Sequence, residues 1–194
     1  MRTSRLGLLG PAVLVALTPP ALFAGLSKVV AISWVAFAAM AGAALFGGRT
    51  AASTDANRLV WGYGLASGAM ITSASAFLVP QAVGSDPQLG GFGIALGVVA
   101  GFSAHTLGHR AMHADLPFDH TAVELTAHAL SAGAVIGLVY GNVADLGLLL
   151  GLSIVSHKGP AGYAAADRLR RADRPVSMLL FPAAGVGMAA IPAA

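Results

Sequence analysis

The stretch Leu152–Ala166, LSIVSHKGPAGYAAA, sets a histidine, a lysine, a proline and two glycines within an otherwise apolar run. A charged side chain near the centre of a bilayer costs about 2.5–3.5 kcal/mol on insertion scales, so such a residue usually faces a cavity, a partner or a pathway. If this run crosses a membrane, His157 and Lys158 are the first candidates for function. Packing alone does not explain a lysine at that depth.

The composition of the whole chain favours a membrane setting. Of its 194 residues, 56% are hydrophobic and 10% are charged, and the mean hydropathy is +0.76, whereas soluble domains are about 25% charged. Cysteine is absent, which excludes disulfides and thiolate metal sites. The net charge of +3 comes from arginines in short loops, where the positive-inside bias explains them without a nucleic-acid partner. We expect a single transmembrane domain, residues 1–194, whose partner is the lipid bilayer.

Seven segments are long and apolar enough, or nearly so, to cross a hydrocarbon core, which takes about 20 residues. They are Leu6–Gly25, Val29–Gly47, Leu59–Val83, Gly90–His109, Thr121–Gly141, Leu146–Ala166 and Pro175–Pro192. The loops between them are short and polar, and no long linker divides the chain. The predicted fold is therefore an all-α polytopic transmembrane bundle of about seven spans.

The basic residues of the loops predict the orientation. All nine arginines fall on one side of a seven-span topology, whereas the other side carries Lys28, with Asp86 and Asp145 in its remaining loops. We therefore expect a cytoplasmic N-terminus, in the plasma membrane of a prokaryote. Residues 1–26 have two interpretations, an extra N-terminal span or a signal-like segment, because the charged MRTSR precedes an apolar run.

All six histidines lie between residues 105 and 157. Three of them, His105, His109 and His113, are spaced four apart and begin a His-rich cytoplasmic segment over residues 105–120. On a helix they would form one stripe, and imidazoles at this spacing can share a Zn²⁺ ion. The alternative is a polar helix end that protrudes into the cytoplasm.

A second polar stripe lies on the fifth span and comprises His120, Glu124, His128 and Ser131. These positions share one helical face. A carboxylate followed by an imidazole on one face suits the stepwise dehydration of a cation, or a proton relay. The alternative is that His120 and Glu124 are interfacial and that His128 bonds a neighbouring helix.

Two prolines predict kinks near these polar residues. Pro160 removes the hydrogen bond to the carbonyl of Ser156, and Gly162 allows another helix to approach closely. Pro80 marks a second kink, beside which Gln81 could offer an amide oxygen to a passing ion. We expect the bundle to be broken at Pro160 and near Pro80, with a site between the fifth and sixth spans.

Three stretches together resemble the ZIP (Zrt/Irt-like) family of divalent metal transporters. The third span ends in FLVPQAVGS, where the family has a Pro-Glu-Ala segment. The fifth span has His128 followed by Gly133 and Gly137, and the sixth has HKGPAG from His157, where the family has His-x-x-Pro-Glu-Gly. The resemblance covers residues 30–190, with the family's last two helices missing. It implies a ZIP-like bundle with a metal site at His128 and His157.

The sequence departs from the family pattern at that metal site. The carboxylates that the family places four residues after each histidine are replaced by Ala132 and Ala161, and Gln81 replaces the glutamate of the Pro-Glu-Ala segment. In the seventh span, Phe181 stands near the place of another glutamate. Lys158 adds a charge that opposes a bound cation by Coulomb repulsion, and we hypothesise that it substitutes for an ion that the carboxylates would hold.

The function we expect is transport of a divalent, zinc-like cation past His120, Glu124, His128 and His157. The cation is cargo, and no firmly bound cofactor is expected. The alternative is a non-transporting ZIP-like membrane protein that acts as a sensor or a partner subunit. Enzyme motifs such as HExxH are missing, so we expect no enzyme. The small-residue stretch GIALG, with Gly93 and Gly97, predicts a homodimer contact.

Overall fold

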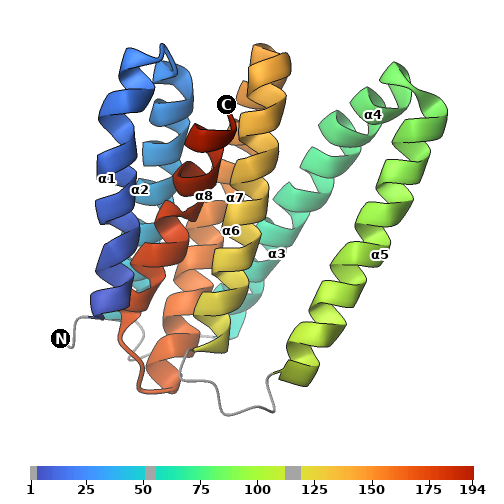
Figure 1. The fold of residues 1–194 in the computed structure, drawn as a ribbon. Helices are drawn as coiled ribbons and strands as arrows, with labels where there is room; N and C mark the ends of the chain where they lie inside the picture. Colours follow the sequence, from blue (N-terminus) through green and yellow to red (C-terminus); the bar gives the residue numbers. More distant parts are fainter. Residues whose placement is uncertain (1–3, 51–55, 112–118) are drawn as a thin grey trace.

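The computed structural model is an all-α bundle (Figure 1). It describes residues 4–50, 56–111 and 119–194, and inside α2, α3 and α5 some side chains are not described. Within these ranges the chain forms seven helical rods and no strand. The predicted all-α class is therefore confirmed.

The rods match the seven apolar segments closely. The α-helices are α1 Arg5–Phe23, α2 Ser27–Thr50, α3 Ala56–Ser73, α4 Val79–Ser85, α5 Pro87–Ala111, α6 His120–Asn142, α7 Ala144–Arg171 and α8 Leu180–Ala193. A π-helical turn, Ala74–Leu78, joins α3 and α4 into one rod, and a 3-10 turn, Val176–Leu179, leads into α8. Each rod covers its predicted segment, with ends that differ by a few residues.

Four helices in the described part of the chain are long and apolar enough to cross a membrane. They are Arg5–Phe23, Ser27–Gly47, His120–Asn142 and Val176–Ala193. These helices indicate an integral membrane protein, as the composition predicts. The apolar part of α5 is shorter, Pro87–Ser103, the α3–α4 rod is interrupted by its π turn, and α7 contains several ionisable residues. The number of seven spans therefore stays a prediction.

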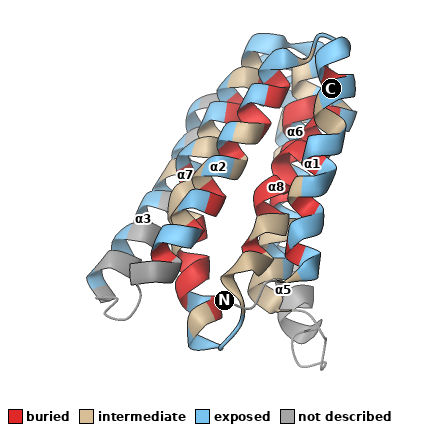
Figure 2. Cartoon of the chain, turned by 90° about the vertical axis from the view of Figure 1, so that its left-hand side faces the viewer, coloured by how far each residue is buried: buried red, intermediate tan, exposed pale blue. Residues whose placement is uncertain are grey.

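Helix α8 is the central element of the main bundle. It packs against α6, α2 and α1, and its residues 182–187 are all buried, as the red bands of α8 in Figure 2 show. A Cβ atom at Gly133 of α6 would overlap the carbonyl oxygen of Val186, and one at Gly137 would overlap that of Ala190. Glycines thus let α6 and α8 approach backbone to backbone, which is how helices associate within lipid.

Helix α7 packs against α2, α3 and α6. It was expected to be broken at Pro160, but it remains helical from Ala144 to Arg171. One missing backbone hydrogen bond does not end a helix that neighbours hold in place, and Gly162 packs onto the carbonyl oxygen of Met40 in α2. The α3–α4 rod, in contrast, is interrupted by the π turn, which places Pro80 in the first turn of α4, where a missing N–H costs least.

Helices α4 and α5 pack against each other, and Figure 1 shows the end of the α3–α4 rod and α5 leaning away from the other helices. Six large apolar side chains described in α5 are exposed, namely Leu89, Phe92, Leu96, Val98, Val99 and Phe102. A Cβ atom at Gly93 or Gly97 would meet open space. The homodimer contact expected at these glycines stays a prediction.

The alternating helix directions gather the arginine-bearing ends on one side. The start of α1 and the end of α7 lie at the lower end of the bundle in Figure 1, and they carry Arg5, Arg168, Arg170 and Arg171. The first turns of α2 and α7, which carry Lys28 and Asp145, lie at the opposite end. The side of the membrane that each end faces stays a prediction.

Candidate functional site

Two histidines meet in the interface between α6 and α7. The Nε2 atoms of His128 and His157 are 3.3 Å apart, and their ring centroids are 5.6 Å apart with planes tilted by 56°. His157 is 3% exposed, whereas His128 is exposed. The Nδ1 atom of His157 lies 3.3 Å from the carbonyl oxygen of Ser153. If Nδ1 carries the proton and donates it there, the Nε2 lone pair of His157 points toward His128.

This geometry suits two kinds of interaction. A separation of 3.3 Å is at the long end for a hydrogen bond between the two imidazoles. It is also the separation of two nitrogens on one tetrahedral Zn²⁺ ion, which is about 3.3–3.4 Å when the Zn–N bonds are about 2.0–2.1 Å. In the described residues, however, no group of three or more His, Cys, Asp or Glu side chains is placed to hold a metal. The pair supplies two ligands of a site, not four.

Two cavities meet at this histidine pair. The first has a volume of about 280 Å³ and reaches from the pair to Arg168 near the arginine-rich end. The second has a volume of about 320 Å³ and extends from the pair to Leu150 and Ser153 in the first half of α7. Both are lined by Met70, His128 and His157. The helices α3, α6 and α7 therefore line two chambers that adjoin at the pair.

The polar stripe predicted on α6 runs beside these chambers. Glu124 lines the first cavity, and its Oε1 atom lies 3.4 Å from Nε2 of His120. Ser131 lines the second cavity, and its hydroxyl donates to the carbonyl oxygen of His128 over 3.0 Å. Glu124, His128 and Ser131 thus follow one another along the chambers, with His120 beside Glu124.

Two alanines, each four residues after a histidine of the pair, flank that pair. Ala161 lines the first cavity and Ala132 lines the second. A carboxylate at either position would face the space in which a ligand of His128 and His157 would sit. The structure brings the predicted positions together, but the side chains there offer no ligand atoms.

Among the described residues, Lys158 is the largest fully buried side chain, with 1% of its surface exposed. It lines the first cavity together with Arg168 and Glu124. Within the described residues, no hydrogen bond or ion pair is made by its ammonium group. Two cationic side chains therefore share this cavity with a single carboxylate, which opposes the binding of a cation at the pair.

Other predicted residues lie elsewhere. Gln81 and Pro80 line a third cavity of about 400 Å³ against Leu146 and Leu149, at the start of α7. His113 and the side chains of His105 and His109 lie outside the described residues. The proposed metal capture by that stripe therefore stays a prediction.

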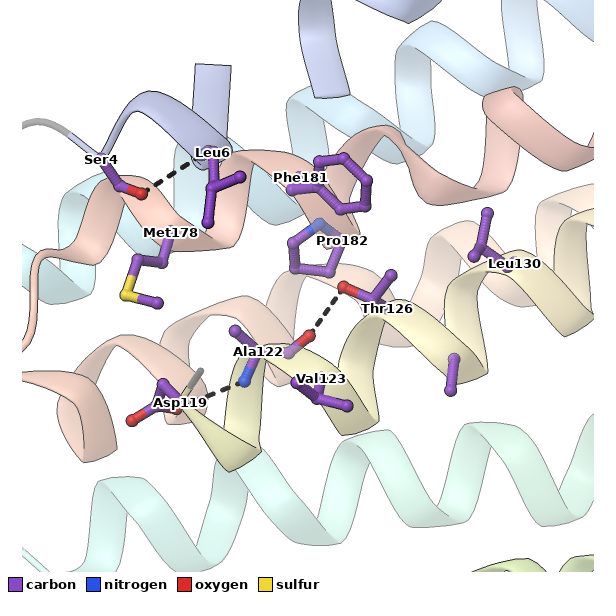
Figure 3. Close-up of a pocket in the computed structure, with 12 residues that line it drawn as sticks. Ser4, Leu6, Asp119, Ala122, Val123, Thr126, Leu130, Met178, Phe181 and Pro182 are labelled. Carbon is purple, nitrogen blue, oxygen red and sulfur yellow. Dashed lines mark hydrogen bonds between the residues drawn. The ribbon is translucent and has the colours of Figure 1, made fainter. Parts of the chain in front are cut away.

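A further cavity of about 380 Å³ lies between α1, α6 and α8 (Figure 3). It is lined mostly by apolar side chains, and Phe181 is among them rather than near the histidines. The one ionisable side chain among its described lining residues is Asp119. This carboxylate caps α6, since it accepts from the backbone nitrogens of Thr121 at 2.9 Å and Ala122 at 3.3 Å. The cavity therefore offers no reactive group beyond a helix cap.

Several lining residues escaped prediction from the sequence. In α7, Ala165 and Arg168 line the first cavity together with the predicted Lys158 and Ala161, and the spacing of three and four along these positions is a helical stripe that the sequence does contain. Ser67 and Met70 of α3 also line it. Nothing in the local pattern of α3 marks these two residues, because the residues around them, GLASGAM over 64–70, are mostly small or apolar.

Comparisons with protein-family models, with curated proteins and with solved structures found no match.

Proposed function

We propose that the protein passes divalent, zinc-like cations across a membrane through the chambers between α3, α6 and α7. The observation that supports this most directly is the separation of 3.3 Å between His128 Nε2 and His157 Nε2, at the point where the two cavities meet. Imidazole nitrogens are preferred ligands of Zn²⁺. Two protein ligands, completed by water, would hold the ion weakly enough for it to leave again.

The order of polar groups along α6 supports a path through both cavities. His120 and Glu124 would collect the partly hydrated ion at the arginine-rich end, which we propose is cytoplasmic. The histidine pair would then hold it, and the second cavity, lined by Ser131, would take it onward. Movement of α3 against α6 and α7 would open one chamber at a time, in the manner of alternating access.

A ZIP-like fold of about seven spans in a prokaryotic plasma membrane is part of this proposal. It is supported by the pairing of His128 with His157 and by the positions of Ala132 and Ala161 in the adjoining cavities. The glycines Gly133 and Gly137 support it less, because their contacts with α8 explain them through packing alone.

A second candidate function is a non-transporting, ZIP-like membrane protein that acts as a sensor or a partner subunit. It is favoured by the alanines at the two carboxylate positions and by the buried cation Lys158 next to the pair. Such a protein would retain the scaffold without moving an ion.

The two candidates differ in zinc uptake by vesicles that contain the purified full chain. Transport requires saturable uptake that falls to the level of empty vesicles in both His128→Ala and His157→Ala. Ser156→Ala is the matched control, because this exposed residue adjoins His157 and its hydroxyl donates within α7 to Ser153. A folded wild-type protein without uptake would favour the second candidate, and uptake that survives both histidine changes would contradict the proposed path.

A further inference from the structure

The first cavity contains a cation whose charge is not balanced by a nearby group. Lys158 is 1% exposed and lines a space of about 280 Å³. Its ammonium has no hydrogen-bond or ion-pair partner within the part of the chain that the structure describes. A buried charge of this kind is costly unless it is paired. Because Lys158 lines an open chamber, a ligand that enters the chamber can pair with its ammonium.

We propose that this cavity is a binding site for a small monovalent inorganic anion, for which chloride is the probe. The ammonium of Lys158 would supply the principal charge. Ser67 and Thr121 line the same cavity, where their hydroxyls would supply further donors, and Arg168 lines its end near the arginine-rich side.

The carboxylate of Glu124 does not pair with the ammonium of Lys158. It lines the same cavity, but its ion-pair partner is His120, at 3.4 Å, and its side chain is 43% exposed. Its distance from Lys158 exceeds the ion-pair range, since the two residues form no salt bridge. Glu124 also limits the charge of the anion, because a second negative charge would face this carboxylate without a further buried cation to offset it.

The size of the cavity agrees with a small hydrated anion. Its volume of about 280 Å³ is several times the roughly 30 Å³ that one water molecule occupies in the liquid. Chloride and a few water molecules fit, and the waters would bridge the anion to the hydroxyl groups. The site goes beyond the proposed transport and does not depend on it, since it requires neither a metal nor movement of an ion.

The test compares the thermal unfolding of the full chain in detergent as chloride replaces gluconate at constant ionic strength. We expect Tm to rise with chloride and to saturate in the wild type. Lys158→Met should abolish this response, and Lys28→Met should retain it. Lys28 is the matched control because it is the other lysine of the chain and lies at the opposite end of the bundle, in the first turn of α2.

Binding of radioactive chloride to the purified wild-type chain gives a second readout that needs no variant to fold. We expect about one chloride per chain, displaced by bromide and not by sulfate. Lys158→Arg, which keeps the positive charge, should still bind chloride with altered affinity. Absence of binding by the wild type, an unchanged response in Lys158→Met, or equal displacement by sulfate would each overturn the proposal. None of these outcomes depends on zinc uptake.

Discussion

His157 Nε2 and His128 Nε2 are 3.3 Å apart across the interface of α7 and α6. Among the described residues, the cavities on either side of this pair have Met70 as their one further lining residue in common. A ligand that moves directly from one cavity to the other therefore passes two imidazoles and one thioether. Substitutions at or beside this pair therefore test both the passage of a ligand between the cavities and the binding of a metal ion.

The first prediction concerns the two chambers. The chain has no cysteine, so Ser67→Cys reports on the first cavity and Ala74→Cys on the second. We expect a charged thiol reagent to label both, and zinc to slow the labelling because the ion occupies the space between them. The protection should disappear when His157→Ala is added. The rates are measured by mass spectrometry of the intact protein.

Val99→Cys is the control for this labelling. Its side chain is exposed on α5, among apolar residues, and a charged reagent should label it slowly in vesicles, without an effect of zinc. Protection by zinc that persists after the loss of His157 would show that zinc binds the introduced thiol itself, and would count against the shared path.

The second prediction concerns the contact between α6 and α8. A Cβ atom at Gly133 would overlap the carbonyl oxygen of Val186, so Gly133→Ala must push the two helices apart. We expect a loss of about 1–3 kcal/mol in stability, the usual cost of overpacking a core. The measurement is the unfolding of the purified protein in detergent, followed by circular dichroism.

The matched change is Gly93→Ala on α5, where a Cβ atom would meet nothing within 4 Å. Here the alanine should stabilise the helix by about 0.5–1 kcal/mol, because it restricts the unfolded chain. Equal effects of the two changes would mean that α8 does not lie against Gly133.

The third prediction concerns the hydrogen bond that links α1 to α2. Trp34 Nε1 donates to the hydroxyl of Thr18 over 3.0 Å, and that hydroxyl donates in turn to the carbonyl oxygen of Leu14. Thr18→Val leaves the indole N–H without its acceptor, at a cost of about 1–3 kcal/mol. Thr126→Val is the comparison, because its hydroxyl donates in the same way to the carbonyl oxygen of Ala122. We expect Thr18→Val to be less stable than Thr126→Val in urea or thermal unfolding. Equal stabilities of the two variants would mean that Trp34 does not donate to Thr18.

The sequence predicts where each helix lies along the chain better than it predicts which helices pack against each other. Apolar runs of about 20 residues are readily recognised, and all seven such segments are helical in the structure. Which helix lies at the centre could not be predicted, because helices that are apolar all round carry no stripe that separates a lipid-facing side from a packed one. The central position of α8 depends on contacts such as Gly187 with Leu14, and these join residues far apart in the chain.

The candidate site was predicted unevenly for a similar reason. The meeting of His128 and His157 was expected from a resemblance between spaced residues and a known pattern, and the structure places their rings in contact. The helical period predicts Glu124 and Ser131 on the same side of α6, and in the structure they line two adjoining cavities. The lining contributed by Ser67 and Met70 was not predictable. It depends on how α3 leans against α7, and no local pattern encodes that angle.

The last prediction restores a missing ligand. Ala132 follows His128 by one helical turn and lines the second cavity beside the pair, so Ala132→Asp places a carboxylate where it can reach an ion held by both imidazoles. We expect zinc to bind about tenfold more tightly, equivalent to about 1.4 kcal/mol, and uptake to become slower because the ion leaves less readily.

Ala161→Asp should gain less affinity, since Lys158 lines the same cavity and would pair with the new carboxylate. Ala127→Asp adds the same charge to α6 but faces the cavity next to α1 and α8, so zinc affinity there should stay at the wild-type value. Equal affinities for Ala132→Asp and Ala127→Asp, measured by calorimetry on the folded proteins, would show that a metal ion does not sit between His128 and His157.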